Sequence, residues 1–199
     1  QYGYVKRNTH RNTSWDKAKF EVVGHHYADL SDLDNGVALM NDCKYGYMVH
    51  DNLLDLNLLR SPSNPDPDAD KGSHSFTYSL FPHKDNLIRS DVISEASCLN
   101  QEPILFDGMA GKVKIHVELM GEGLELSVLK KAEKEDAWII RIIETHGRMS
   151  FGTIKLNGKI VECDLMEWKE LSKREIVNGS FRIKFNPFEI KTLKLIYRA

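Results

Sequence analysis

The sequence contains few cysteines, no surplus of positive charge and no long apolar run. Its three cysteines are odd in number and far apart in 199 residues, which does not fit a disulfide framework and favours a reducing compartment. Lysine plus arginine (27) nearly balances aspartate plus glutamate (29), so the chain lacks the basic excess with which nucleic-acid binders neutralise phosphates. No apolar stretch is long enough to cross a bilayer. We therefore expect a cytoplasmic protein that binds neither nucleic acid nor membrane.

Familiar catalytic and metal-binding motifs are also missing. The sequence has no GxSxG elbow, no phosphate-binding glycine loop, no HExxH and no CxxC. His25 and His26 are adjacent, and because neighbouring strand residues face opposite sides, we expect half-buried strand histidines rather than metal ligands. Asp29, Asp32 and Asp34 could supply a glycosidase carboxylate pair, but we interpret ADLSDLDNG as a turn, which favours aspartate and serine.

A proline-rich acidic stretch is SPSNPDPDADKG, residues 61–72, which we name the acid loop. Its alternate aspartates, Asp66, Asp68 and Asp70, suggest the start of an EF-hand calcium loop. Such a loop needs glycine at its sixth position and glutamate at its twelfth, whereas these positions hold Lys71 and Thr77 here. We therefore interpret the segment as a charged surface loop that is stiffened by its prolines.

Alternation of apolar and polar residues predicts an all-β protein made of antiparallel sandwiches. This period-two pattern is typical of strands with one solvent-facing side, and it occurs at residues 75–81, 112–119, 181–185 and 192–197. In the first of these strands, Phe76, Tyr78 and Leu80 form the expected apolar face. Residues 138–144 (WIIRIIE) are apolar on both faces, as expected for an inner strand buried between layers. Short strands separated by turn residues favour the sandwich architecture.

The strand pattern is interrupted around Pro103, where a proline and two glycines occur close together. Residues 1–108 are the more irregular part of the chain and hold five of its six prolines. Residues 109–199 contain a regular succession of strands. They include the pair Asn157-Gly158, which accepts the positive φ angles of a type I′ turn and predicts a hairpin. We expect two domains, 1–108 and 109–199.

Five long blocks together extend over nearly the whole chain. Their sequences are THRNTSWDKAKFEVVGHHYADLSD, NGVALMNDCKYGY, LLRSPSNPDPDADKGSHSFTYSLFPH, LKKAEKEDAWIIRIIETHG and FNPFEIKTLKL. These blocks closely resemble the C-terminal region of the glycoside hydrolase family 38 α-mannosidases, and most of all the cytosolic and bacterial branch of that family. Because the blocks are long, the resemblance is far more specific than any short motif.

The resemblance implies a fold and a division of labour. Residues 1–108 would be the last part of a galactose-mutarotase-like supersandwich, and residues 109–199 a smaller terminal β-sandwich. In this family the zinc ligands, the aspartate nucleophile and the general acid lie on an N-terminal α/β barrel, and none of those motifs is present here. The resemblance therefore implies no catalytic or metal-binding residue in this segment, which we expect to be inactive alone. Zinc and the retaining hydrolysis of α-D-mannosidic bonds would belong to the full-length enzyme.

The role that the resemblance implies for this chain is structural. It would cover one face of the barrel, its partner in the same polypeptide, and would supply loops to the rim of a site for α-mannosides. Arg60 is the preferred rim residue, because a guanidinium can position a hydroxyl through paired hydrogen bonds. An ion pair of Arg60 with an aspartate of the acid loop (Asp66, Asp68 or Asp70) is the alternative. The full set of rim candidates is Arg60, Asn41, Asp42, Lys44, Tyr45, Asp66 and Asp68.

Two further expectations concern binding partners. A carbohydrate-binding β-sandwich module is the alternative function, with Trp15, Trp138 and Trp168 as a possible aromatic platform, although tryptophans in the core are the commoner case. A chain that begins inside a sandwich would also leave strand edges unpaired, and such edges favour pairing with a second copy. We therefore expect a tendency to form homo-oligomers.

Overall fold

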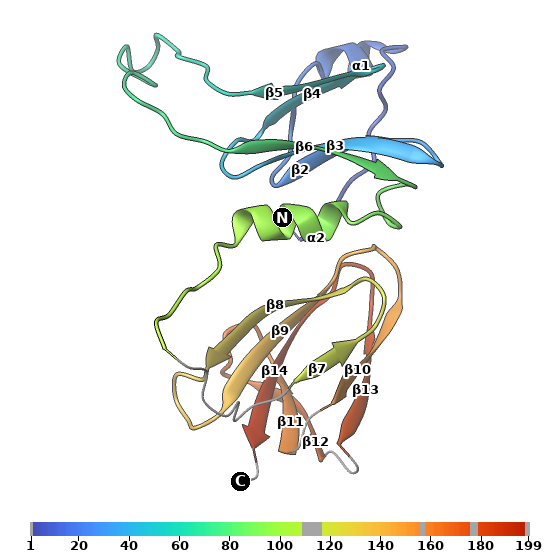
Figure 1. Ribbon diagram of the computed structural model, residues 1–199, viewed down its shortest axis with the longest axis vertical. Coiled ribbons are helices and arrows are strands. Elements are labelled where there is room, and N and C mark those ends of the chain that lie inside the picture. The colour runs from blue at the N-terminus through green and yellow to red at the C-terminus, as the bar shows by residue number, and fades with distance from the viewer. Residues whose placement is uncertain (1, 109–116, 156–157, 176–178, 198–199) are drawn as a thin grey trace. The chain divides into compact units, whose positions relative to one another are not determined.

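A computed structural model describes residues 2–108, 117–155, 158–175 and 179–197. These residues form antiparallel sheets with two short helices (Figure 1), so the predicted all-β class is confirmed. By internal contacts the chain separates into two compact units, residues 6–106, and residues 107–199 together with 1–5. Within the described residues, no helix has the length and apolar character needed to cross a membrane.

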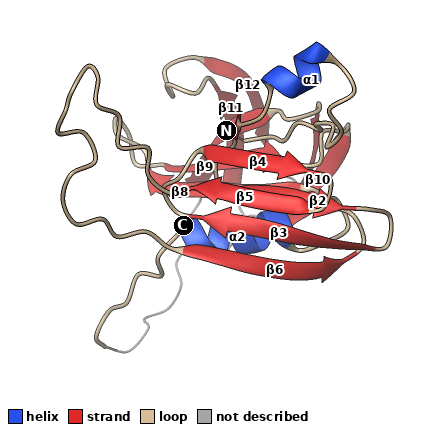
Figure 2. Cartoon of the chain, turned by 90° about the horizontal axis from the view of Figure 1, so that it is seen from above, coloured by secondary structure: helices blue, strands red, loops and turns tan. Residues whose placement is uncertain are grey.

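The first unit, residues 6–106, is layered. Helix α1 (Ser14–Ala18) precedes strands β1 (Val22–Val23), β2 (Tyr27–Ser31), β3 (Asn35–Asn41), β4 (Gly46–His50), β5 (Leu53–Asn57) and β6 (Tyr78–Lys84), and helix α2 (Val92–Asn100) follows. The strands form two sheets, β1-β4-β5 and β2-β3-β6. Figure 1 shows the second sheet between the first sheet and α2. A long connection without strand structure joins β5 to β6 and extends beyond both strands (Figure 2).

Helix α2 was not predicted from the sequence. Its buried residues Val92 and Ala96 are four apart, so they lie on one side of the helix. They pack against Ala38 and Met40, which face them from β3. The N-cap residue, Asp91, makes no side-chain capping bond, so the sequence carries only a weak start signal for this helix.

The face of β6 corrects one strand expectation. The strand begins at Tyr78, and the alternation is present as predicted, but Tyr78 (56% exposed) and Leu80 (63% exposed) point to the outer side. The side that packs inward carries Phe81, which joins the cluster under α2. Phe76, the third member of the expected apolar face, lies before the strand begins. Helix packing rather than the strand's own pattern therefore decides which face is buried.

The second unit is a β-sandwich. Its strands are β7 (Glu118–Met120), β8 (Leu124–Lys131), β9 (Trp138–Glu144), β10 (Ser150–Lys155), β11 (Gly158–Cys163), β12 (Glu170–Glu175), β13 (Ser180–Phe185) and β14 (Ile190–Tyr197). They form the sheets β13-β10-β7 and β12-β11-β14-β9-β8. Strand β9 lies between β14 and β8 and is buried on both faces, which confirms the prediction of an inner strand at 138–144. The core between the sheets consists of Ile140, Ile142, Ile154, Ile160, Ile183, Phe185, Leu193 and Leu195.

Two predictions for this unit have a different outcome. The predicted hairpin around Asn157-Gly158 is wrong, because β10 and β11, which flank it, belong to different sheets. An Asn-Gly pair favours a tight turn, but the pair does not determine which sheet the following strand joins. Residues 156–157 themselves, and most of the strand expected at residues 112–119, lie outside the described residues.

A buried carboxylate joins two turns of the second unit. Glu144, at the end of β9, is fully buried. Its carboxylate accepts hydrogen bonds of 2.9–3.2 Å from the backbone amides of His146, Gly147, Arg148 and Phe188. The start of the chain packs at the same place, where the Tyr4 ring meets the Phe188 ring edge-on at 5.5 Å and the Tyr4 hydroxyl donates to the carbonyl of His146. No sequence pattern indicates this contact.

Candidate functional site

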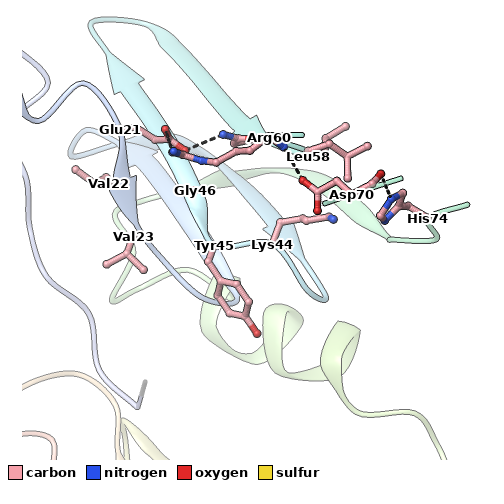
Figure 3. Close-up of a pocket in the computed structure, with 12 residues that line it drawn as sticks. Glu21, Val22, Val23, Lys44, Tyr45, Gly46, Leu58, Arg60, Asp70 and His74 are labelled. Carbon is pink, nitrogen blue, oxygen red and sulfur yellow. Dashed lines mark hydrogen bonds and ion pairs between the residues drawn. The ribbon is translucent and has the colours of Figure 1, made fainter. Parts of the chain in front are cut away.

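An open surface pocket of about 470 Å³ lies in the first unit. It forms where β1, the turn between β3 and β4, the end of β5 and the acid loop come together, as Figure 3 shows. Its charged and aromatic lining residues are Glu21, Lys44, Tyr45, Arg60, Asp70 and His74. Three of the seven rim candidates, Lys44, Tyr45 and Arg60, are thus brought together by the fold.

Arg60 forms an ion pair with Glu21, a residue that the sequence analysis missed. The guanidinium is 67% exposed, while the Glu21 side chain is 19% exposed. Glu21 also accepts a hydrogen bond of 2.9 Å from the side-chain amide of Asn57. The hydrogen bonds from Arg60 and then Asn57 lower the pKa of Glu21, so the carboxylate is ionised at neutral pH. Gly46, the first residue of β4, has no side chain, and an added Cβ there would collide with the Glu21 carboxylate. The glycine therefore makes room for this carboxylate.

The alternative expectation for Arg60, an ion pair with Asp66, Asp68 or Asp70, is wrong. Asp70 instead accepts hydrogen bonds from the backbone amides of Ser61 (2.8 Å) and Arg60 (3.2 Å). These two bonds lower the pKa of Asp70. The guanidinium extends past the loop to Glu21 (Figure 3), which is fixed beside β4 and β5. Asp66 and Asp70 instead accept hydrogen bonds from nearby backbone amides.

Asp66 and Asp68 organise the acid loop itself. Asp66 accepts a hydrogen bond of 2.9 Å from the backbone amide of Asp68, and Asp68 forms an ion pair with Lys71. Neither aspartate belongs to the described residues that line the pocket. The prediction of a charged surface loop is confirmed, since nearly every residue of the loop is exposed.

Asn41 is buried and holds the turn that carries Lys44 and Tyr45. The Asn41 side chain is 1% exposed, and its oxygen accepts from the backbone amides of Cys43 and Lys44. Its amide group donates to the hydroxyl of Tyr47, and burial raises the pKa of this hydroxyl to about 12. Asn41 therefore acts on the pocket through the turn rather than by touching a ligand.

The remaining turn residues are arranged around the pocket in different ways. Asp42 accepts a hydrogen bond of 2.9 Å from the backbone amide of Thr77 and so ties the turn to the chain before β6. The ammonium of Lys44 lies 4.8 Å from the centre of the Phe76 ring. Tyr45 is 55% exposed, and Figure 3 shows its ring pointing away from Arg60. The site thus offers cationic donors, ionised acceptors and an exposed aromatic ring, which together can bind a small polar ligand.

The histidine and aspartate expectations of the first unit are resolved differently. His25 and His26 are exposed in a bend before β2, so the expected half-buried strand position is wrong. Asp32 accepts from the backbone amides of Asp34 and Asn35, both at 2.8 Å, as a turn aspartate does. Asp29 forms a nearly buried pair with His83 that spacing in the sequence could not reveal. In the part of the chain that the structure describes, no three potential ligands of the His, Cys, Asp and Glu types gather into a metal-binding group.

Comparisons with known proteins agree with this architecture. Residues 1–68 match the glycosyl hydrolases family 38 C-terminal domain, and residues 123–193 match the family 38 C-terminal beta sandwich domain. The chain is 41% identical to alpha-mannosidase G of Dictyostelium discoideum over 98% of its length, and 35% identical to alpha-mannosidase 2C1 of Mus musculus over 100%. It spans about a fifth of these relatives, 19% and 20% respectively.

A solved structure shares the fold. The crystal structure of an alpha-mannosidase from Enterococcus faecalis V583 superposes with a TM-score of 0.65 at 14% identity, over 98% of this chain and 23% of that one. The two family domains and the relatives along the whole chain agree with each other. The chain therefore belongs to glycosyl hydrolase family 38 and corresponds to its C-terminal region.

Proposed function

We propose that the chain is the structural, site-completing C-terminal region of an α-mannosidase that hydrolyses α-D-mannosidic bonds with retention. The observation that carries the proposal is the match to proteins named α-mannosidases along 98–100% of the chain, which is about a fifth of their length. The catalytic barrel of the same polypeptide would be the partner, and an α-mannoside the substrate. Residues of that barrel would supply the two carboxylate steps of a retaining glycosidase.

Zinc, which the family resemblance implies, does not fit the described residues of this chain. They provide no group of three metal-binding side chains, and the family's ion would therefore be held elsewhere in the longer protein. What this chain would contribute is the pocket around Arg60 and Glu21. A cation and a carboxylate held in fixed positions can orient substrate hydroxyls without taking part in bond cleavage.

A cytoplasmic location is part of the proposal. All three cysteines are free, and two of them, Cys43 and Cys98, are exposed. Exposed thiols persist in reducing compartments, whereas secreted proteins commonly oxidise them. Fractionation of cells that produce the full-length enzyme tests this, and an enzyme found with secreted proteins would overturn it.

The experiment that tests the proposed function uses the full-length enzyme. Purified enzyme is expected to release the aryl group from an aryl α-mannoside, and deletion of residues 1–199 is expected to abolish turnover. Arg60→Ala should lower kcat/KM about tenfold, the effect of losing one charged hydrogen bond of ~1.4 kcal/mol. Arg182→Ala, which changes an arginine of β13 in the second unit, is the control and should leave kcat/KM unchanged.

Three outcomes decide between the parts of this proposal. An enzyme that does not cleave aryl α-mannosides rejects the activity. An active enzyme in which Arg60→Ala and the control behave alike keeps the activity and removes Arg60 from the site. A restored kcat/KM in Arg60→Lys would show that charge alone suffices, because lysine cannot form the planar paired bonds of a guanidinium.

A carbohydrate-binding module is the second candidate, and the tryptophans favour it more than the sequence suggested. Trp15 is 78% exposed and Trp168 is 68% exposed, so the expectation of core tryptophans holds for neither. Trp138 is partly buried against the core of the second unit. Titration with mannose or α-mannobiose, followed by tryptophan fluorescence, tests the module. Saturable binding supports it, and an unchanged spectrum rejects it.

A further inference from the structure

The turn between β11 and β12 has a fixed backbone. Residues 164–169 form this turn, which we name the apolar turn. The amide of Asp164 donates to the carbonyl of Lys169 (3.0 Å), and the amide of Glu167 donates to the carbonyl of Asp164 (3.0 Å). The Asp164 carboxylate accepts from the backbone amides of Trp168 (2.8 Å) and Lys169 (3.2 Å). Four hydrogen bonds thus close six residues, and the shape of the turn does not depend on its outward side chains.

A clamp on Glu167 ties the apolar turn to the sheet. Glu167 has a φ of +65°, a left-handed conformation that is strained for a non-glycine residue. Its carboxylate is 12% exposed and forms ion pairs of 2.9 Å with Lys130 on β8 and Arg141 on β9. Arg141 also donates to the carbonyl of Leu165 at 2.9 Å. The neighbouring strands therefore over-determine the position of the turn and hold it in a strained conformation.

The side chains that this turn carries are large and apolar. Leu165 (54% exposed) and Met166 (62%) occupy its two central positions, where glycine, proline, asparagine, aspartate and serine are usual. Trp168 (68%) follows, and Leu171 (62%) lies next along the chain on β12, an edge strand of its sheet. The ammonium of Lys134 lies 4.8 Å from the centre of the Trp168 ring and restrains that ring. Tryptophan and methionine are enriched in protein interfaces, and large apolar side chains that are exposed side by side mark interaction sites.

We propose that the apolar turn is a docking element for another surface of the same α-mannosidase polypeptide, outside residues 1–199. The inference rests on the proposed function, because the occupant is a part of the longer enzyme. The relatives are about five times as long as this chain, since it covers 19–21% of each. Such a surface would present an apolar recess to Leu165, Met166 and Trp168, with a carboxylate near Lys134.

The size of the surface favours this occupant over a second copy or a separate protein. The exposed parts of the four side chains amount to roughly 500 Å², whereas each partner of a stable complex buries ~800 Å². A contact of that size is too small to hold two free molecules together. Within one polypeptide it suffices, because linkage gives the two surfaces a millimolar effective concentration.

Oxidation of Met166 in the full-length enzyme tests the docking. Dilute hydrogen peroxide converts an exposed methionine to its sulfoxide, with the peroxide reduced to water, and mass spectrometry of the peptide gives the rate. Met166 is expected to react at least tenfold more slowly than N-acetylmethionine under the same conditions. A rate within about twofold of N-acetylmethionine would overturn the proposal. Met149, which is 56% exposed in the same unit, is measured alongside it.

A pair of variants distinguishes docking from other causes of protection. Met166→Asp places a charge in the docked surface and should lower the unfolding temperature of the full-length enzyme by several degrees. Leu129→Asp, at a 51% exposed leucine of β8, is the matched control and should change it little. Equal effects of the two variants would count against a specific contact.

The other occupants each give a distinct result. Protection of Met166 that disappears on dilution of the enzyme would assign the surface to a second copy, and protection that appears only with added mannose would assign it to sugar. Either result overturns the proposal. A protected Met166 in a protein without α-mannosidase activity would reject the proposed function and leave the docking in place. An active enzyme with a freely oxidised Met166 would reject the docking alone.

Discussion

The acid loop of the first unit and the apolar turn of the second are each closed by one aspartate. Asp70 accepts from two backbone amides at 2.8 and 3.2 Å, and Asp164 does the same at the same distances. The two segments differ in the side chains that they present to solvent. The acid loop presents aspartates that pair with its own lysine and amides, whereas the apolar turn presents side chains that are 54–68% exposed. The carboxylate therefore fixes the backbone, and the exposed side chains determine which surfaces the segment can contact.

The largest effect on stability is expected where a carboxylate closes turns inside the core. Glu144 is a carboxylate that closes turns through backbone amides, as Asp70 and Asp164 do, but it is fully buried and serves four amides. Glu144→Ala should lower the free energy of unfolding by about 3 kcal/mol or more, because four partly buried backbone amides lose their acceptor. Urea denaturation measures the loss.

The control for Glu144 is a glutamate near the same turns. Glu122 is 75% exposed at its side chain and pairs with Arg148, so Glu122→Ala should leave the midpoint of unfolding nearly unchanged. If the two variants were equally stable, burial would not strengthen the closure, and the comparison between surface and core carboxylates would fail.

The second prediction concerns a buried aspartate whose hydrogen-bond donors are side chains rather than backbone amides. Asp29 on β2 accepts from the Ser31 hydroxyl at 2.6 Å and pairs with the His83 ring at 2.8 Å, and the Asp29 and His83 side chains are at most 5% exposed. Burial is the largest single influence and lowers the pKa of His83, but the hydrogen bonds to Asp29, Lys84 and Asp85 and the charge of Asp29 together outweigh it, so that pKa is raised. The folded chain therefore binds the His83 proton more tightly than the unfolded chain does.

The sign of the pH dependence follows from that difference. The stabilisation is fully present below the unfolded histidine pKa of about 6.5 and is lost as the pH rises through the higher folded pKa. The midpoint of unfolding of the first unit should thus fall between mildly acidic and mildly alkaline pH. Asp29→Asn should remove this fall and cost about 1–2 kcal/mol at pH 6. A midpoint that rises with pH in the unmodified chain would contradict the assignment.

The third prediction concerns the two surface carboxylates that close their segments, Asp70 and Asp164. Asp70→Ala should increase the rate of hydrogen exchange at the Ser61 amide about tenfold, because a surface hydrogen bond is lost. Asp164→Ala should do the same at the Trp168 amide. Each variant should leave the other segment unchanged. Because its hydrogen bonds lower the pKa of Asp70, protection of the Ser61 amide should persist at neutral pH and disappear only as the pH falls through this lowered pKa.

The controls for this exchange experiment lie inside the acid loop. Asp66 accepts a hydrogen bond from the amide of Asp68 rather than from the chain at the start of the loop, so Asp66→Ala should leave the Ser61 amide protected. Faster Ser61 exchange in that variant would show that the loop closes as a whole, and not through Asp70.

Sequence patterns predicted the interior of the second unit well and the first unit less well. Strand β9 is apolar on both faces, so its place inside the sheet could be predicted from its own residues. The face of β6 could not, because Leu80 and Phe81 are both apolar and helix α2 decides which of them is covered. The hairpin expected at Asn157-Gly158 failed for the same kind of reason, since a turn pattern reports a reversal but not the sheet that the next strand joins.

The candidate site shows the same limit. Lys44, Tyr45 and Arg60 were predicted as rim residues, and the fold brings them to one pocket. Glu21, which is 39 residues from its partner Arg60, could not be found, because an isolated glutamate between a helix and a strand carries no signal of a distant contact. Whether these residues meet a substrate stays a prediction that the Arg60 variants test.

The smallest expected effect concerns the ion pair of Lys71 and Asp68. Both side chains are largely exposed, at 68% and 75%, so solvent screens the attraction and the pair costs side-chain entropy to form. Lys71→Ala should therefore change the free energy of unfolding by less than about 0.5 kcal/mol and leave the Ser61 amide protected. A clear loss of protection in Lys71→Ala would mean that the charges of the acid loop hold its shape together with Asp70. The acid loop and the apolar turn would then no longer share one means of closure, because the loop's outward residues would be fixing its backbone as well.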